Sequence, residues 1–341
     1  MTYRENRELL GMPNIVLDRI LKHSDFKSIF TLRGVCKSLR DLIDDSKPDL
    51  KLDSPKILTT LDGFTLEIES KSFNEPKMIK YRNVNRVYLR DPARPYTAKT
   101  ILLQNPISKF QEDVGRVLDH QKSTLDTFDI AVKYMRHTPE HAEVLNFIQQ
   151  KLESRPTPLK TLSFRMSAMN QNQALQIFKN LDSRKIQNLS IQYTLVNAFG
   201  RAKTPLQIDK ILDLDQFKNA KKLDLSRFTV DSKLGNFLHF EDAIIRLRSI
   251  SREEAKFFPA NSTMRRFEIS YDDFPGEQAF GDSMGQRQKV DFGDCWYIRM
   301  PNHPGFALCV FLGNDYSRCL AFSKVQLSSV PKSVVLLDLL F

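Results

Sequence analysis

Two histidines, His137 and His141, have a spacing that could suit a metal site. Residues four apart share one face of a helix, so two imidazole groups there could bind one zinc ion. Pro139 lies between them and suits the first turn of a helix, which leaves His137 before the helix begins. The sequence contains no H-E-x-x-H motif. We therefore expect no metal at these residues.

The four cysteines, Cys36, Cys295, Cys309 and Cys319, are candidates for metal binding, disulfides or nucleophilic chemistry. No two of them form a C-x-x-C pair, and their spacings match no zinc signature. Cys309 and Cys319 lie in apolar, strand-like runs, and Cys36 has no obvious histidine partner. We expect buried, reduced thiols in a cytoplasmic or nuclear protein, with disulfides as the alternative.

Motifs of enzymes that bind phosphates or dinucleotides are absent, because the sequence contains no P-loop and no G-x-G-x-x-G. Gly281 and Gly285 lie in the polar stretch GDSMGQRQ, which no predicted strand precedes, and we expect a loop there. His239, next to Phe240, suits a half-buried packing position better than that of a catalytic base. The sequence predicts a protein with no catalytic residues, no cofactor and no bound metal.

The overall charge is positive, with 51 Lys and Arg residues against 41 Asp and Glu residues, a net charge of +10 and a pI near 9.3. This charge favours association with acidic partners such as RNA, but it does not indicate the fold. The basic residues are dispersed, and the densest group has no accompanying aromatic motif. That group is Lys218, Lys221, Lys222 and Arg227. An RNA-binding solenoid is therefore the weakest of the alternatives.

Neither a membrane nor a secretory destination is expected. Residues 1–10 carry four charged residues and no apolar core, unlike a secretory signal. The longest apolar runs, at residues 306–312 and 334–340, are much shorter than the roughly 18 residues of a membrane span. We expect a cytoplasmic and/or nuclear location.

Residues 12–45 have the apolar periodicity of three short helices. Pro13 suits the first turn of the first helix. Ser24 or Asp25 could cap the second helix, and Gly34 could end it. The stripe on the first helix consists of Val16, Leu17, Ile20 and Leu21. Because so small a bundle cannot bury all of its apolar positions, the surplus must pack on the next domain or on a partner.

The order and spacing of these residues resemble the F-box motif over residues 12–45, without a gap. Met12, Asn14-Ile15, Ser24 and Leu39 depart from the usual residues of that motif. The positions that carry the resemblance are Pro13, Val16-Leu17, Ile20-Leu21, Phe26, Leu32-Arg33, Val35-Cys36-Lys37 and Leu39.

The resemblance implies docking on the small Skp adaptor of cullin-RING ubiquitin ligases, and through it on a cullin. Apolar side chains on one helical face would fill a groove of the adaptor. The residues implied to bind the adaptor are Pro13, Leu17, Ile20, Leu21, Phe26, Leu32, Val35 and Cys36. Some of these would instead hold the three helices together, and Leu17 and Ile20 are expected to do both.

Residues 49–105 alternate with the two-residue period of strands and are expected to connect the helical module to a larger domain. Asp62-Gly63 separates two alternating runs, as in a hairpin. Further strands are expected at residues 78–81 and 86–89, with a turn or linker at residues 91–95.

Residues 106–341 repeat a short L-x-L-like core, at residues 125–130, 159–164, 186–191, 222–225 and 266–269, with a weaker copy at 244–247. Helical periodicity lies between them, at residues 107–118, 144–152, 174–181 and 208–217, and Ser251 to Glu254 match a capping box. This alternation predicts parallel strands with crossover helices, at spacings close to those of leucine-rich repeats. The expected fold class is α+β or α/β. It comprises a three-helix module (residues 1–48), connecting strands (49–105) and an irregular leucine-rich-repeat-like array (106–341).

In a curved array of this kind, the strand residues between the buried ones line one open face. These residues are chemically mixed, which suits a protein target better than a phosphate backbone. The candidate target-binding residues are Asp129, Ser163, Ser190, Asp224, Arg246 and Glu268. Terminal strands at residues 295–300, 306–312, 318–325 and 333–339 are expected to close the array, with Trp296 in the core.

The array also resembles the FTH-type domain that follows the F-box in some F-box proteins. Residues 218–225, 236–240, 248–251 and 294–301 carry this resemblance, which covers residues 115–341. It implies a module that binds a substrate or cargo. Together the two resemblances imply a non-catalytic substrate-receptor subunit of an SCF-type (Skp–cullin–F-box) ubiquitin ligase, with an unidentified protein target. A non-ligase scaffold that recruits a regulatory protein is the main alternative.

Overall fold

The computed structural model covers the whole chain, and its described residues are 11–60, 63–71, 77–82, 86–91, 94–102, 105–132, 139–168, 170–193, 205–257, 264–300, 303–314, 318–331, 334 and 336–337. The chain forms two compact units. Unit 1 comprises residues 1–164 and 176–185, and unit 2 comprises residues 165–175 and 186–341. Strand β7 (Thr161–Ala168) and helix α6 (Gln171–Phe178) contribute residues to both.

Unit 1 begins with three helices of ten residues each, α1 (Asn14–His23), α2 (Phe26–Val35) and α3 (Lys37–Ser46). Pro13 is the N-cap of α1 rather than part of its first turn. Asp25 caps α2, because its carboxylate accepts a hydrogen bond of 2.7 Å from the Ser28 backbone N–H. The prediction that Gly34 ends α2 was wrong, since the helix ends one residue later.

A small apolar core holds these three helices together. Cys36, with extended backbone, both ends α2 and precedes α3, so the two helices are joined without a longer loop. The rings of Phe26 and Phe30 lie 4.3 Å apart between centroids. The buried apolar side chains of the bundle are Leu17, Leu21, Phe26, Ile29, Leu39 and Ile43.

The strands of unit 1 follow the order β6-β1-β2-β3-β4-β5. Their bounds are β1 Ser54–Thr60, β2 Gly63–Glu69, β3 Lys77–Arg82, β4 Arg86–Asp91, β5 Arg94–Leu102 and β6 Leu125–Val132. β1 and β2 form the predicted hairpin, in which Thr60 pairs with Gly63, while Asp62 lies outside the described residues. β6 pairs with β1 in parallel. β5 was not predicted, because Pro95 led us to expect a turn or linker at its start.

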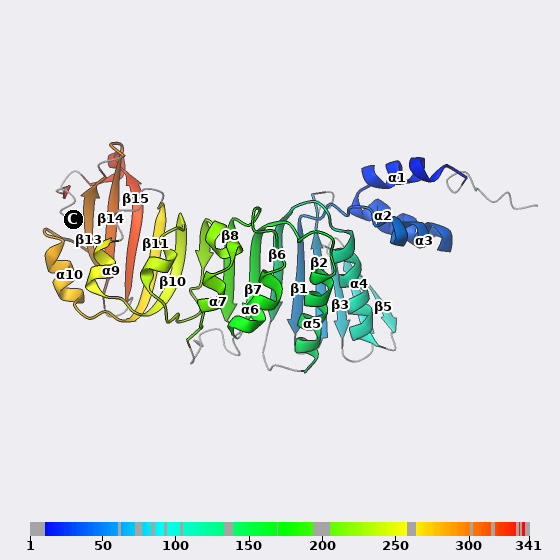
Figure 1. Ribbon diagram of the computed structural model, residues 1–341, viewed down its shortest axis with the longest axis horizontal. Coiled ribbons are helices and arrows are strands. Elements are labelled where there is room, and N and C mark those ends of the chain that lie inside the picture. The colour runs from blue at the N-terminus through cyan, green and yellow to red at the C-terminus, as the bar shows by residue number, and fades with distance from the viewer. Residues whose placement is uncertain are drawn as a thin grey trace, which may run out of the picture. The chain divides into compact units, whose positions relative to one another are not determined.

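Helices α4 (Pro106–His120) and α5 (Pro139–Glu153) lie on one face of this sheet (Figure 1). Asn105 caps α4 by accepting hydrogen bonds from the backbone N–H groups of Ile107 and Ser108. Phe110 of α4 then packs on β2 and β3, with its ring centroid 4.9 Å from Phe64 and 5.2 Å from Tyr81. This contact fixes the helix on the connecting strands.

The strands of unit 2 follow the order β12-β13-β14-β15-β11-β10-β9-β8. The neighbouring strands from β8 through β11 pair in parallel, as predicted. The β11–β15, β15–β14, β14–β13 and β13–β12 pairs are antiparallel. Their bounds are β8 Asn188–Tyr193, β9 Lys222–Asp224, β10 Asp242–Ser249, β11 Arg266–Asp273, β12 Gln288–Val290, β13 Gly293–Arg299, β14 Phe306–Gly313 and β15 Cys319–Gln326. Trp296 is 1% exposed and lies in the core, as predicted.

The helices of unit 2 are short. They are α7 Asp209–Leu212, α8 Asp215–Asn219, α9 Arg252–Phe257 and α10 Glu277–Ser283, with 3-10 turns at Leu234–Phe237 and Leu327–Ser329. The predicted helical stretch at residues 208–217 is thus split between α7 and α8. The predicted capping box at α9 is confirmed, because Glu254 N–H donates to Ser251 Oγ and Ser251 N–H donates to Glu254 Oε2, each at 3.1 Å.

Mixed helix and strand content, with a helical N-terminal module, agrees with the predicted fold class, and the strand and helix order is compatible with a repeat-like array. The domain boundaries at residues 48 and 105 stay predictions. Within the described residues, none of the helices combines the length and apolar character that crossing a membrane requires.

Candidate functional site

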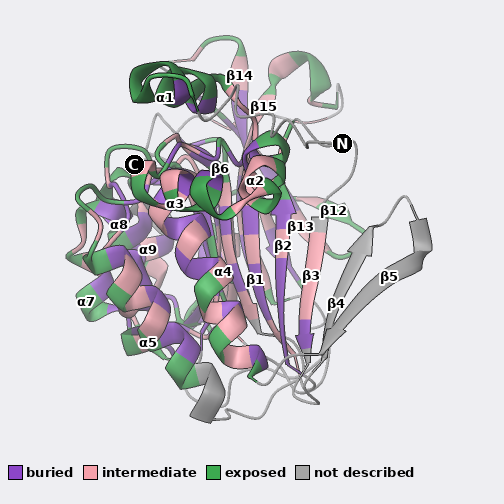
Figure 2. Ribbon diagram, turned by 90° about the vertical axis from the view of Figure 1, so that its right-hand side faces the viewer, coloured by how far each residue is buried: buried purple, intermediate pink, exposed green. Residues whose placement is uncertain are grey.

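Helix α1, the residues just before it and the end of α2 expose a concentration of apolar side chains to solvent. Among the described residues, seven large apolar side chains are exposed, and five of them lie between residues 12 and 35. They are Met12, Ile15, Val16, Ile20 and Val35, with exposed fractions of 38, 78, 39, 36 and 64%. Figure 2 shows α1 mainly in the colour of exposed residues. We call these five residues the apolar patch.

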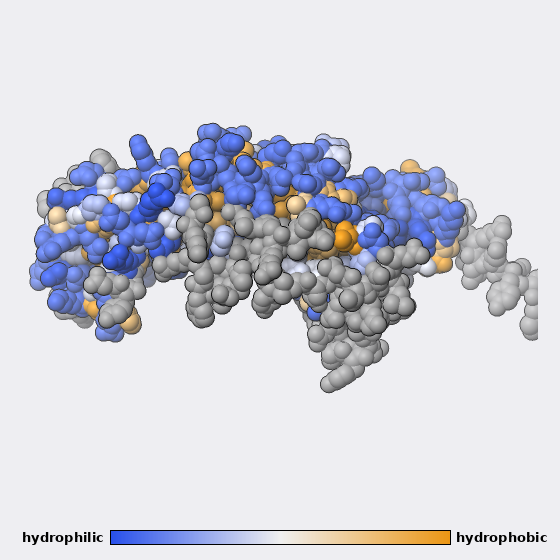
Figure 3. Space-filling view, turned by 90° about the horizontal axis from the view of Figure 1, so that it is seen from below, coloured by the Kyte–Doolittle hydropathy of each residue, from blue (hydrophilic) through white to orange (hydrophobic). Residues whose placement is uncertain are grey.

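The apolar patch contrasts with the rest of the described surface. Hydrophilic residues predominate among the described atoms on the face shown in Figure 3. The other two exposed large apolar side chains, Val290 and Phe292, lie at the turn between β12 and β13. Single exposed apolar residues are normal in soluble proteins, whereas several within one short segment are typical of a surface that another molecule covers.

Two adjoining stripes of α1 have different environments. Leu17 and Leu21 are 5 and 4% exposed and lie in the core of the three helices. Val16 and Ile20 come directly before Leu17 and Leu21 in the sequence. Because Val16 and Ile20 are four residues apart, they are neighbours on the helix surface. The inner stripe therefore holds α1 in place, and the outer stripe remains available to a partner.

The eight residues predicted to bind the adaptor fall into three groups by burial. Pro13, Ile20 and Val35 are exposed. Leu32 and Cys36 are half-buried. Leu17, Leu21 and Phe26 are buried. The buried three pack inside the bundle, so their visible role is to hold the helices together. Adaptor binding by these residues stays a prediction.

Three members of the apolar patch, Met12, Ile15 and Val16, were not among the predicted adaptor-binding residues. Val16 belongs to the stripe seen in the sequence, whereas Met12 and Ile15 were noted as departures from the motif. The surplus of apolar residues in so short a segment was the available signal. Periodicity alone does not say which side of a wide apolar stripe faces inward.

An ion pair fixes α2 against α3 next to the apolar patch. The Arg33 guanidinium donates two hydrogen bonds to the Asp44 carboxylate, each 2.8 Å long. This pairing lowers the pKa of Asp44 below its ordinary value, since the charged Arg33 stabilises the carboxylate, while burial acts in the opposite direction. Two parallel bonds restrict geometry more than one, so Val35, two residues after Arg33, is presented in a defined position.

The chain that leaves α3 is tied back to unit 1 by hydrogen bonds. Asp49 accepts them from the backbone N–H groups of Lys122 and Ser123, at 2.9 and 3.1 Å. Lys51 Nζ donates to the Lys22 carbonyl, in the last turn of α1, at 2.7 Å. All three bonds join elements of unit 1, and the bond from Lys51 also satisfies a carbonyl at the helix end.

Four of the six candidate target-binding residues lie on neighbouring strands of unit 2. Figures 1 and 2 show α7 and α9 on one face of these strands, and the buried Ala243, Ile245 and Leu247 of β10 alternate with less buried residues. The register places Ser190 opposite Asp224, and Ile244 opposite both Asp224 and Glu268. These side chains therefore share the face that the helices leave open, and we call it the open face.

Most polar groups of the open face bond to one another. Ser190 is 9% exposed, and its hydroxyl donates to Asp224 Oδ2 at 3.3 Å. Arg246 pairs with Asp272 and donates from Nε to Thr229 Oγ1 at 3.2 Å. Glu268 pairs with Arg266 at 2.7 Å. A target on this face would meet paired charges rather than a uniform basic surface.

The remaining two candidates lie in unit 1. Asp129 of β6 is 3.8 Å from Lys56 Nζ, on the strand that pairs with β6. Ser163 of β7 is half-buried, and its carbonyl accepts a hydrogen bond from the Thr161 hydroxyl at 2.7 Å. Target binding by all six candidates stays a prediction.

Comparison with known protein families identifies two segments of the chain. Residues 9–51 match the F-box domain, and residues 142–274 match the FTH domain. The chain contains an F-box domain and an FTH domain. No curated protein and no solved structure matches it. The two resemblances predicted from the sequence are therefore confirmed.

The domain limits relate these families to the geometry. The F-box domain contains α1, α2 and α3, and with them the whole apolar patch. The FTH domain runs from within α5 to the residue after β11 and includes five of the six target-binding candidates, Asp129 being the exception. β12 to β15 follow it. An F-box together with an FTH domain is typical of adaptor proteins.

A serine-hydrolase pattern follows β11 and was missed in the sequence. Gly281 to Gly285 (GDSMG) fit G-x-S-x-G, in which a nucleophilic serine sits on a sharp turn from strand to helix. Here Ser283 is the last residue of α10, and its hydroxyl donates to the Phe280 carbonyl at 2.7 Å. The arrangement lacks the strand-to-helix turn of that motif. The predicted loop was also wrong for Gly281, which lies within α10.

The histidines do not form a metal centre in the described part of the chain. His239 is half-buried, and burial lowers its pKa below the ordinary value. Its ring lies 4.0 Å from that of Phe240, and Nε2 is 3.1 Å from the Phe217 carbonyl, which suits the predicted packing position. His137 and the side chain of His141 lie outside the described residues. Within those residues, no group of three or more His, Cys, Asp or Glu could hold a metal ion.

Proposed function

We propose that this protein is the substrate-receptor subunit of an SCF-type ubiquitin ligase, acting in the cytoplasm and/or nucleus. Its F-box would dock on a Skp-family adaptor, which binds a cullin, and its FTH domain would hold a protein target. The observation that carries the proposal is the apolar patch, five exposed side chains within a domain whose members generally bind this adaptor.

Docking of this kind has a sufficient physical driving force. Complete burial of an exposed Val or Ile side chain contributes about 1.5–3 kcal/mol. The patch is partly exposed, so each residue can contribute about half of that on average. A standard interface buries about 800 Å² per partner, and a few central residues supply most of its energy. Ile20 and Val35 are exposed, and Val35 lies two residues after Arg33 of the fixed Arg33–Asp44 pair, so both are suited to such central roles.

The FTH domain would contribute position rather than chemistry. The proposed complex would raise the local concentration of target lysines near the ubiquitin-charged enzyme, and tethering alone can raise rates by orders of magnitude. The non-catalytic role assigned to this chain follows from that division of labour. The open face, with its paired Arg and Asp residues, is the surface that we assign to the target.

The first experiment measures adaptor binding by the full chain. We expect the wild-type protein to bind a purified Skp-family adaptor in isothermal titration calorimetry. Ile20→Arg and Val35→Arg should each weaken binding by at least tenfold, because each places a charge in an apolar contact. Val290→Arg is the matched control, since Val290 is similarly exposed but lies in β12. It should bind like the wild type.

Two results would count against adaptor docking. One is the absence of heat change with the wild-type chain. The other is unchanged affinity in Ile20→Arg and Val35→Arg proteins whose circular dichroism matches that of the wild type. Leu17 is unsuitable for this test, because it is buried in the bundle and its replacement by Arg would disturb the fold.

The second experiment separates a ligase from a scaffold. Adaptor, cullin and this chain are reconstituted with a partner captured by the FTH domain, and ubiquitin transfer to that partner is followed by mass spectrometry. Transfer that the Ile20→Arg variant abolishes supports the ligase. A stable assembly that transfers no ubiquitin to its captured partner supports the scaffold.

A further inference from the structure

Two cysteine side chains of unit 2 lie unusually close to each other. Cys295 on β13 and Cys309 on β14 have their sulfur atoms 3.2 Å apart. The two strands pair antiparallel, with Cys295 opposite Phe311 and Tyr297 opposite Cys309. The cysteines are therefore diagonal neighbours on the same face of the sheet. A disulfide has an S–S length of about 2.05 Å, so the sulfurs need to approach by about 1.2 Å.

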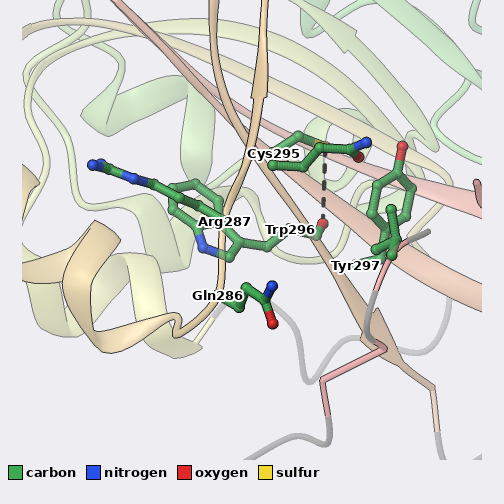
Figure 4. A pocket seen from close by; sticks show the side chains of 7 residues that line it. Gln286, Arg287, Cys295, Trp296 and Tyr297 are labelled. Atoms are coloured by element: carbon green, nitrogen blue, oxygen red, sulfur yellow. Dashed lines mark hydrogen bonds between the residues drawn. The ribbon is translucent and has the colours of Figure 1, made fainter.

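A pocket gives reagents access to Cys295. Cys295 is 5% exposed overall, yet it lines an open pocket together with Gln286, Arg287, Gln288, Trp296 and Tyr297. Figure 4 shows Gln286, Arg287, Cys295, Trp296 and Tyr297 around this pocket. Arg287 pairs with Asp294 at 3.0 Å on its rim. A small oxidant can enter a pocket of this kind, whereas a sulfur atom in a sealed core would be inert.

The surroundings of the two sulfur atoms divide their roles. The hydrogen bond between the two sulfur atoms lowers the pKa of the Cys295 thiol to about 7, against the effect of burial, and Tyr297 adds a further hydrogen bond. The same interaction raises the pKa of Cys309 above its ordinary value. Cys295 is thus the thiol that ionises more readily to the nucleophilic thiolate near neutral pH, and Cys309 is the neutral thiol that can attack it in a second step. A thiolate next to a resolving thiol is the arrangement of redox-sensitive cysteines.

We propose that Cys295 and Cys309 form a redox modification site that hydrogen peroxide converts to a disulfide between β13 and β14. In the first step the Cys295 thiolate attacks one peroxide oxygen, the O–O bond breaks, and sulfenic acid and hydroxide form. In the second step the Cys309 sulfur attacks the Cys295 sulfur, the S–O bond breaks, and water leaves with the Cys309 proton. Two thiols lose two electrons in total, and the peroxide is reduced to two molecules of water.

The other two cysteines provide internal controls. Cys36 lies in the F-box, between α2 and α3, and Cys319 lies at the start of β15. Cys309 pairs with Ser323 of β15, four residues along the strand from Cys319, which corresponds to about 13 Å. A specific site should therefore oxidise Cys295 and Cys309 together, before Cys36 and Cys319. This site does not depend on the proposed ligase function.

The experiment uses the full chain, reduced and then freed of reductant. The protein is treated with hydrogen peroxide at pH 7, and the remaining thiols are alkylated at intervals and counted by intact mass. Cys295 and Cys309 should become protected at the same rate, about tenfold faster than Cys36 and Cys319. Peptide mapping should find a peptide that links residues 295 and 309 and that dithiothreitol separates. Alkylation of all four cysteines to the same extent at every time, or linkage of another pair, overturns the proposal.

Variants test the two steps separately. In Cys309→Ser, dimedone should trap a lasting sulfenic acid on Cys295, because the resolving thiol is gone. In Cys319→Ser, the 295–309 link should form at the wild-type rate. If the sulfenic acid in wild-type protein persists as long as in Cys309→Ser, the second step does not occur and the site is not a disulfide switch.

Discussion

Arg33 on α2 and Asp44 on α3 face each other through two parallel hydrogen bonds of 2.8 Å. Arg33 lies two residues before Val35, the most exposed apolar side chain of α2. The pair therefore sets the angle at which the end of α2 meets α3. It links the interior of the F-box to the surface that we assign to the adaptor.

Asp44→Asn should destabilise the F-box by about 1 kcal/mol. The substitution removes the charge of a partly exposed pair but keeps its shape, and partly exposed ion pairs contribute little more than this. The measurement is the protection of α2 and α3 amides against hydrogen exchange, in the full chain at pH 7. Asp45→Asn, an exposed neighbour on α3, is the matched control and should leave protection unchanged. Equal protection in both variants would mean that the pair adds nothing.

The contribution of this pair should depend on pH in one direction. Because Arg33 lowers the pKa of Asp44 in the folded state, the stabilisation is present above the unfolded pKa of about 4 and disappears as pH falls through the lower folded value. The difference in amide protection between the wild type and Asp44→Asn should therefore be constant from pH 7 to pH 5 and shrink below pH 4. A difference that grows on acidification would contradict the assignment.

Leu17→Ala should mainly reduce the stability of the F-box, whereas Ile20→Ala should mainly weaken adaptor binding, although both remove apolar groups from α1. Leu17 is 5% exposed, and a cavity in its place costs about 2–5 kcal/mol of F-box stability. Ile20 is 36% exposed, so Ile20→Ala should cost less than about 1 kcal/mol of stability and instead weaken adaptor binding severalfold. Hydrogen exchange and calorimetry on both variants check this division. Similar losses of stability would show that Ile20 is also part of the core.

Gln171→Ala should destabilise unit 2 by about 1–3 kcal/mol, because Gln171 is a buried cap for a helix remote in sequence. Its Oε1 accepts hydrogen bonds from the backbone N–H groups of Lys210 and Ile211, at 2.8 and 3.3 Å, and its Nε2 donates to Asp209 at 2.8 Å. Loss of such a partner leaves buried donors unsatisfied. Urea unfolding of the full chain checks the value. Asn172→Ala, exposed and adjacent, should unfold like the wild type.

The parallel core of unit 2 could be predicted because its strands bury alternate residues. In β10, for example, Ala243, Ile245 and Leu247 are buried and the residues between them are not. β5 could not be recognised in this way, since Arg94-Pro95 at its start is more typical of a turn than of a strand. Gln171 gave no signal, because a cap contributed by a distant residue leaves no local pattern.

The candidate site was predictable as a domain but not residue by residue. The spacing from Pro13 to Leu39 identified the F-box, yet it could not separate Val16 from Leu17, adjacent apolar residues of which one is outside and the other inside. Burial depends on how the three helices pack against one another, whereas the spacing of apolar residues describes each helix only by itself. The close approach of Cys295 and Cys309 was invisible for the same reason, because strand register decides which residues become neighbours.

The reaction of Cys295 with peroxide should have the pH dependence of a thiol whose pKa is about 7. The groups that face its sulfur are Cys309 on β14 and Tyr297 on its own strand, with the Arg287–Asp294 pair on the pocket rim. Because the thiolate is the reactive form, the rate should rise about tenfold from pH 6 to pH 8 and change little above pH 8. The reaction of an ordinary thiol with a pKa of about 8.5 continues to accelerate above pH 8.

Cys309→Ala removes the hydrogen bond that stabilises the Cys295 thiolate, so the rate at pH 7 should fall severalfold and the profile should shift to higher pH. Stopped-flow or quenched alkylation measures both profiles, with Cys319→Ala as the control. A wild-type rate that keeps rising to pH 9, parallel to that of Cys36, would show that the neighbouring sulfur does not stabilise the thiolate.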